Sequence, residues 1–212
     1  DRVGARGPAL LVLALSRPLK GRDEARVVRE GIDILLVVDT SSSMLVDSLV
    51  RGVTDLEVVK SVVAEFVKGR TDDRIGLVTF AAWPRTECPL TLDLPGLLAR
   101  VEGVRPVQKN TEEDGTAIGV ALGQAAAKLR ESDAKSKVIV LLTDGVENQH
   151  QIEPAEAAAL CKDLGIRVYT IGAGIRLVGD AFVAQDAIDT DLLKTIAATT
   201  GGRFFRAKDV EV

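Results

Sequence analysis

Apolar runs that alternate with helix-like segments dominate the chain after Gly31. Continuous runs of apolar residues are typical of strands that are covered on both faces of a sheet. By this criterion we expect strands at Ile32–Val38, Arg74–Phe80, Val138–Leu142, 166–174 and 203–207. Residues 82–91 contain two prolines, at positions 84 and 89. Because proline is tolerated at sheet edges, this segment is predicted to form a short edge hairpin.

The segments between these runs have the periodicity of helices. Thr54 and Glu57 have the spacing of a capping box, and Gly69 is expected to end the helix that they begin. The apolar face of that helix would carry Leu56, Val59, Val63, Phe66 and Val67. Further helices are expected from near Gly115 to Arg130, at 153–165 and at 189–202, with a short one at 93–104.

The order of strand and helix predicts the fold class. Alternating strands and helices form a mostly parallel sheet with helices on both faces. We therefore expect a doubly wound α/β domain at residues 31–212, with one antiparallel edge strand. Gly115, Gly119 and Gly123 are spaced four apart and would let their helix approach the sheet closely.

Residues 1–30 have a different texture and are predicted to form an N-terminal arm. Pro8–Pro18 is a short apolar run flanked by arginines, and Lys20–Arg29 is highly charged. The run is shorter than the roughly 20 apolar residues that span a bilayer. It fits a surface helix, a strand or the end of a truncated membrane helix, and composition does not choose among these.

The composition of the chain argues against two classes of binding site. The formal net charge is -4 and aromatic residues make up 3% of the chain, so nothing indicates a basic, aromatic-rich surface for nucleic acids. One histidine and two cysteines without CxxC spacing argue strongly against a Cys/His zinc site. Cys161 is expected to be a small buried residue, whereas the pairing of Cys88 and Cys161 stays open.

Oxygen-rich loops follow two of the predicted strands. Asp39, Ser41 and Ser43 come directly after the first strand, and Asp144 follows the strand Val138–Leu142. Thr116 lies at the expected start of a helix. Ligands of such sheets bind beyond the carboxyl ends of the strands, and hard cations such as Mg²⁺, Mn²⁺ or Ca²⁺ prefer oxygen donors. Local turn and helix capping is the alternative explanation of the hydroxyls.

The five candidate ligands leave a hard cation incompletely coordinated. Mg²⁺ takes six oxygens, so water or a carboxylate from a partner has to complete the shell. The site therefore looks suited to capture an acidic group from outside rather than to hold calcium as a structural ion.

Enzymatic interpretations fit less well. A triad of Asp39, a serine and His150 lacks the G-x-S-x-G elbow, and the chain has no P-loop motif. A phosphatase that uses Asp39 as nucleophile requires an acid two residues later, where Ser41 stands. The segment 172–179, "GAGIRLVG", has the wrong spacing for dinucleotides and is predicted to be a turn.

The motifs "DTSSSM", "DGTAIG" and "LLTDG" together resemble the von Willebrand factor A (VWA) domain with its metal-ion-dependent adhesion site (MIDAS). The resemblance implies a Rossmann-like fold and a Mg²⁺ site formed by Asp39, Ser41, Ser43, Thr116 and Asp144. It further implies that the two serines, and often the threonine, contact the ion directly, and that the aspartates often act through water. Ser42 replaces a glycine that is frequent in the family, and we expect only a change of loop conformation there.

Longer blocks between Gly31 and Val212 resemble bacterial aerotolerance-type (Bat-like) proteins. They include "DDRIGLVTFAAWPRTECPLTLD" and "LLKTIAATTGGRFFRA". The resemblance implies a domain on the extracytoplasmic side of the bacterial cytoplasmic membrane, preceded by a membrane helix and continued by a final helix after "KDVEV". The residues after "LLTDG" depart from the family, and Glu147 and His150 are expected to shape a distinct binding rim.

The sequence thus predicts a non-enzymatic, metal-dependent module that captures an Asp or Glu of another membrane or periplasmic protein. A chaperone-like or scaffold domain with a structural metal is the first alternative, and a metal-dependent phosphatase-like hydrolase is the second.

Overall fold

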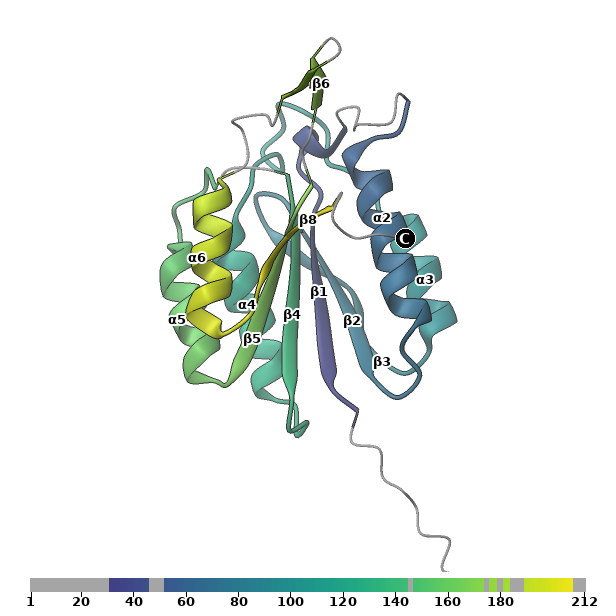
Figure 1. Ribbon diagram of the computed structural model, residues 1–212, viewed down its shortest axis with the longest axis vertical. Helices are drawn as coiled ribbons and strands as arrows, with labels where there is room; N and C mark the ends of the chain where they lie inside the picture. Colours follow the sequence, from purple (N-terminus) through teal and green to yellow (C-terminus); the bar gives the residue numbers. More distant parts are fainter. Residues whose placement is uncertain are drawn as a thin grey trace, which may run out of the picture.

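A six-stranded sheet in the order β3-β2-β1-β4-β5-β8 forms the centre of the molecule (Figure 1). The computed structural model describes residues 31–45, 52–144, 147–173, 176–178, 181–183 and 189–207. The strands of this sheet are β1 Asp33–Asp39, β2 Arg74–Phe80, β3 Pro84–Thr91, β4 Lys137–Thr143, β5 Ile166–Gly172 and β8 Phe204–Arg206. Among the described residues of this sheet only β3 pairs antiparallel, at one edge, which confirms the predicted antiparallel edge strand. Residues 84–91 form one strand that pairs with β2, rather than the short hairpin predicted for this segment.

Helices cover both faces of this sheet (Figure 1). On one face lie α4 Ile118–Arg130, α5 Pro154–Asp163 and α6 Thr190–Thr200, and on the other lie α2 Asp55–Lys68 and α3 Leu94–Gly103. The doubly wound α/β architecture is therefore confirmed.

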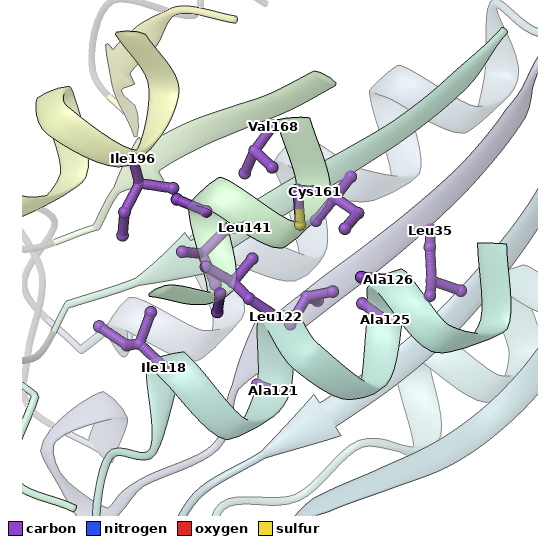
Figure 2. Close-up of a cluster of buried hydrophobic side chains, with 14 of the residues drawn as sticks. Leu35, Ile118, Ala121, Leu122, Ala125, Ala126, Leu141, Cys161, Val168 and Ile196 are labelled. Atoms are coloured by element: carbon purple, nitrogen blue, oxygen red, sulfur yellow. The ribbon is translucent and has the colours of Figure 1, made fainter. Parts of the chain in front are cut away.

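Strand β1 explains how a continuous apolar run serves two cores. All seven of its residues are buried, and successive side chains point to opposite faces of the sheet. Leu35 and Val37 join the cluster beneath α4, α5 and α6, whereas Ile34, Leu36 and Val38 join the cluster beneath α2 and α3. Figure 2 shows the first cluster, with Leu35 opposite the small residues of α4.

Local signals placed α2 correctly. Thr54 is its N-cap and accepts from the backbone N–H of Glu57, while the Glu57 carboxylate accepts from the N–H of Thr54 at 2.7 Å. Both halves of the predicted capping box are therefore present. Four of the five predicted apolar residues are buried, Phe66 is half-buried, and Val62 is buried although its position was not predicted.

Helix α4 differs from the prediction in its start and in its glycines. It begins at Ile118, so Gly115 lies before it in a loop. A Cβ on Gly119 would lie 1.8 Å from the carbonyl oxygen of Ile152, in the segment that leads into α5. A Cβ on Gly123 would meet only the Ile152 side chain, at 3.7 Å. The expectation that these glycines let α4 approach the sheet closely is therefore wrong. Gly119 instead leaves space for the backbone that precedes α5.

Other segments extend or qualify the sequence-based assignment. The short helix at 93–104 is a full α3 of ten residues, and Ser42–Leu45 forms a 3-10 helix, η1. The segment 172–179, expected to be a turn, contains β6 Arg176–Val178, which pairs with β7 Ala181–Val183. Cys88 and Cys161 are both free and buried.

The predicted arm at residues 1–30 and the predicted continuation after "KDVEV" lie outside the described residues. In the part of the chain that is described, no helix has the length and apolar character needed to cross a bilayer.

Candidate metal centre

The oxygen-rich loops lie where the order of the strands reverses. From β1 the chain continues to β2 on one side, and β4 later pairs with the other side of β1. Asp39 is the last residue of β1 and Asp144 directly follows β4, so both lie at the carboxyl edge between these two strands. Ligand sites of open α/β sheets occur at such a switch point.

Asp39 is fully buried, and hydrogen bonds from Ser41 and Thr143 hold its carboxylate. Its Oδ1 accepts from the backbone N–H of Ser41 at 2.8 Å, and its Oδ2 accepts from the hydroxyl of Thr143 at 2.5 Å. Thr143 is the last residue of β4, so this contact joins the ends of the two central strands. The carboxylate therefore has a fixed position at the base of the site.

The hydroxyls of the first loop lead to the second carboxylate. The Oγ atoms of Ser41 and Ser43 are 2.9 Å apart, and the Ser43 hydroxyl donates to Oδ1 of Asp144 at 2.9 Å. Ser41 and Asp144 are buried, while Ser43 is half-buried. Ser41, Ser43 and Asp144 are thus connected through their side chains, and Asp39 is connected to them through the backbone N–H of Ser41.

Thr116 is held at the same edge of the sheet by other contacts, and none of the hydrogen bonds described above involves it. Its N–H donates to the side-chain oxygen of Asn148 at 2.9 Å, and its carbonyl accepts from the N–H of Asn148 at 3.1 Å. The next residue, Ala117, donates to the carbonyl of Ala81 just beyond β2. Thr116 is buried in this position.

The two carboxylates are electrostatically linked. Burial and the negative charge of Asp144 raise the pKa of Asp39 to about 7, against the lowering effect of hydrogen bonds from Ser41 and Thr143. A cation between the carboxylates would offset both the loss of solvation and the repulsion. The arrangement of the two carboxylates therefore favours the binding of a cation.

The donor set fits a hard divalent cation. It consists of hydroxyl and carboxylate oxygens, which Mg²⁺, Mn²⁺ and Ca²⁺ prefer. The described residues contain no group of three or more Asp, Glu, His or Cys side chains arranged to hold a metal. A metal at this edge would therefore depend on the hydroxyls of the loops together with the two aspartates.

Several residues that sequence reasoning did not assign to the site hold its loops. The carboxylate of Asp114 accepts from the N–H of Ser42 at 3.0 Å and from its hydroxyl at 2.8 Å. Burial alone would raise the pKa of Asp114, but hydrogen bonds from Ser42 and Asn110 outweigh it, and this pKa lies below its ordinary value. Ser42 therefore does more than alter the loop conformation, because it ties the loop to a carboxylate.

Glu147 and His150 were expected to form a rim together, and they lie in different environments. The half-buried Glu147 accepts from the N–H of Gly119 at 3.1 Å, in the first turn of α4, where Ala117 provides no side-chain cap. Burial raises the pKa of Glu147, and backbone hydrogen bonds oppose this. His150 is exposed, with Nδ1 3.8 Å from a carboxylate oxygen of Glu153. Gly145, which follows Asp144 in the sequence, lies outside the described residues.

A Rossmann-like sheet with oxygen donors at its switch point defines the class of this domain. Residues 33–212 match the family model of the von Willebrand factor type A domain, and the chain belongs to that family. It is also similar to an aerotolerance-related membrane protein from Bacteroides fragilis, with a TM-score of 0.70 at 25% identity over 83% of this chain and 91% of that one. The predicted likeness to bacterial aerotolerance-type proteins is thereby confirmed.

Two further proteins are similar to this chain, one in sequence and one in fold. An uncharacterized protein of Borreliella burgdorferi is 28% identical over 211 residues, which cover 94% of this chain and 61% of that protein. The chain therefore spans less than two thirds of this relative. A structure of proximal thread matrix protein 1 from the mussel byssus, with a zinc-occupied MIDAS motif, shares the fold, with a TM-score of 0.63 at 23% identity over 85% of this chain and 42% of that one.

Proposed function

We propose that this chain is a divalent-metal-dependent protein–protein interaction module. Asp39, Ser41, Ser43, Thr116 and Asp144 are the proposed ligands of Mg²⁺, with Mn²⁺ or Ca²⁺ as alternatives. The observation that carries the proposal is the meeting of Asp39, Ser41, Ser43 and Asp144 at the switch point, where Asp144 raises the pKa of Asp39. These are oxygen donors, and two of them are carboxylates whose negative charges repel each other.

Each part of the site has a separate task in this proposal. The serine hydroxyls, together with Thr116, offer neutral donors, and the two aspartates supply the negative charge. A bound dication supplies an electrophilic centre for a carboxylate from outside. Because five protein ligands are fewer than the six oxygens of Mg²⁺, we propose that an Asp or Glu of a protein partner takes the remaining position.

Membership of the family supports this interaction role, and so does the zinc-occupied MIDAS motif of the mussel protein. The similarity to an aerotolerance-related membrane protein supports a place in a bacterial membrane-associated complex. We propose that the domain lies on the extracytoplasmic side of the cytoplasmic membrane, and that its partners are membrane or periplasmic proteins. We propose a binding function rather than an enzymatic one.

Titration of the purified chain with Mg²⁺ and Mn²⁺ by isothermal calorimetry tests the metal site. We expect saturable binding by the wild type and a loss of at least about 100-fold in affinity for Asp39→Ala, because a buried charged ligand is removed. Circular dichroism of the variant checks that it is folded. Unchanged binding by a folded Asp39→Ala protein would falsify the ligand assignment.

A second experiment tests the role of the partner. The tagged chain is incubated with membrane extract from its source organism in Mg²⁺, in excess chelator, and as the Asp39→Ala variant. A partner that uses the ion should be retained only by the wild type in Mg²⁺. Replacing candidate Asp and Glu residues of that partner by Asn and Gln should then abolish retention. Equal retention under all three conditions would contradict metal-dependent capture.

A further inference from the structure

Asp114 connects the two loops that carry the proposed metal ligands. Its carboxylate accepts from the N–H of Ser42 at 3.0 Å and from the Ser42 hydroxyl at 2.8 Å, across 72 positions of sequence. Ser42 lies between Ser41 and Ser43, and Asp114 lies two residues before Thr116. One side chain therefore joins the serine loop to the threonine loop.

The Asp114 carboxylate is itself held in place. Its Oδ2 also accepts from the N–H of Asn110 at 3.2 Å, and its own N–H donates to the carbonyl of Thr111. Asn110 has a φ of 61°, in the left-handed region, which turns its N–H within a tight loop. Asp114 is half-buried, so these contacts are only partly exposed to competition from water.

Several contacts hold the serine loop, and Asp114 supplies the contacts that tie Ser42 to the threonine loop. Thr40 is fixed at the base, because its N–H and hydroxyl both donate to the carbonyl of Phe80. Ser41 is fixed by its N–H to Asp39. Beyond it, the Ser43 hydroxyl lies 2.9 Å from the Ser41 hydroxyl, and between these two residues the N–H and hydroxyl of Ser42 both donate to Asp114. By holding Ser42, Asp114 helps to orient the neighbouring Ser43 hydroxyl toward Asp144.

We propose that Asp114 is a positioning residue of the metal centre, which sets the distance between the serine loop and Thr116 by binding the backbone and the hydroxyl of Ser42. This inference rests on the proposed metal function and goes beyond it, because Asp114 is not one of the ligands. Residues that orient metal ligands change metal affinity about 10- to 100-fold when they are replaced.

The variants are chosen to separate geometry from charge. Asp114→Ala removes every contact to Ser42, and Asp114→Asn keeps an oxygen acceptor and a polar partner for Ser42 but removes the charge. Ser42→Ala removes only the hydroxyl. Glu113→Ala is the matched control, because it removes a negative charge from the same loop: the Glu113 side chain is 57% exposed and pairs with Arg85.

Calorimetric titration with Mg²⁺ gives the first readout. We expect Asp114→Ala to weaken binding about 10- to 100-fold, Asp114→Asn to recover most of the affinity, and Glu113→Ala to stay within about twofold of the wild type. If Asp114 acts through Ser42, the double variant of Ser42→Ala and Asp114→Ala should bind no more weakly than Asp114→Ala alone. Additive losses, or equal losses in Asp114→Asn and Asp114→Ala, would overturn the proposal.

Amide hydrogen exchange in the metal-free protein gives a second readout that does not depend on the ion. The N–H of Ser42 should be protected in the wild type and in Asp114→Asn, and should exchange faster in Asp114→Ala. Unchanged protection in Asp114→Ala would overturn the proposed contact.

The comparison with Asp39→Ala separates the two proposals. If the wild type does not bind Mg²⁺, the metal function and this inference both fail. If Asp39→Ala loses binding and Asp114→Ala keeps it, only the positioning role fails.

Discussion

At the scale of single residues, Asp39 shows how burial changes the ionisation of a common side chain. Its carboxyl is completely buried beside Asp144, and its pKa rises to about 7 from an ordinary value of about 3.9. Between about pH 4 and pH 7 the folded chain therefore holds a proton that the unfolded chain has released. The linked stability is present at low pH and is lost as the pH rises through 7.

The first prediction follows from this linkage and concerns the metal-free protein. At pH 8 in chelator, Asp39→Asn should be more stable than the wild type by up to about 4 kcal/mol, because roughly three pH units of unfavourable ionisation are removed. Near pH 4 the difference should disappear. Urea unfolding of both proteins across this range measures the effect. A wild type that gains stability relative to Asp39→Asn as the pH rises would contradict the sign.

Asp33 is a second buried carboxylate, and the fold neutralises it internally. Nε and Nη2 of Arg74 donate to its two oxygens at 2.8 and 2.6 Å, and the hydroxyl of Ser132 also donates to it. Asp33 is 2% exposed. Asp33 begins β1, at the opposite end of the strand from Asp39. The same strand therefore carries a carboxylate in an ion pair, Asp33, and a proposed metal ligand, Asp39.

The second prediction compares this ion pair with an exposed one. Arg74→Met should lower the free energy of unfolding by about 3 kcal/mol, because it leaves a buried charge without its partner. Arg85→Met breaks the Arg85–Glu113 pair, whose side chains are 62% and 57% exposed, and should cost less than about 1 kcal/mol. Chemical denaturation of both variants provides the comparison, and equal losses would refute the argument from burial.

At the scale of elements, the loop before α5 and helix α4 depend on each other. Gly119 leaves space for the carbonyl of Ile152, and Glu147 accepts from the N–H of Gly119. The first turn of α4 thus receives both its packing partner and its cap from residues about 30 positions away. Since Thr116 lies two residues before the start of this turn, the same contacts help to place a proposed ligand.

The third prediction uses the two glycines of α4 as a matched pair. Gly119→Ala should destabilise the domain by about 2 kcal/mol or more, because its Cβ would lie 1.8 Å from a backbone oxygen. Gly123→Ala should stabilise it by up to about 1 kcal/mol, because alanine is the better helix former and its Cβ would make only an ordinary contact at 3.7 Å. Thermal unfolding of the two variants measures both signs.

At the scale of the whole molecule, the folding core and the proposed metal site are separate. The two large clusters of buried apolar residues lie on the faces of the sheet, whereas the site lies at its carboxyl edge (Figure 1). Neither cluster includes any of the five proposed metal ligands. The domain should therefore fold with or without the ion.

The fourth prediction distinguishes a partner-binding ion from a structural one. Chelation should leave the far-ultraviolet circular dichroism unchanged, and it should lower Tm only by the amount by which bound Mg²⁺ had raised it. Mg²⁺ at about 100 times its Kd should raise stability by about 2.7 kcal/mol, which corresponds to roughly 5–11 °C for a chain of this size. Unfolding on chelation at 25 °C would favour the scaffold interpretation with a structural metal.

The sequence by itself determined the strands of the central sheet, most of the helices and the oxygen donors that follow two strands. These features depend on neighbouring residues: a buried run such as Ile32–Val38 has to be covered on both faces, and Thr54 with Glu57 caps a helix from within four positions. The late start of α4 at Ile118 is an exception, because Gly115 fits a helical pattern but lies in a loop.

Only the tertiary structure decided which distant groups meet. The facing of Gly119 toward Ile152, the tie from Asp114 to Ser42 and the raised pKa of Asp39 all join segments that are remote along the chain. Hydrophobic periodicity specifies which side of an element is buried but not which loop packs against it. The physical reason is that packing contacts and electrostatic interactions depend on distance in space, which the spacing of residues along the sequence does not fix.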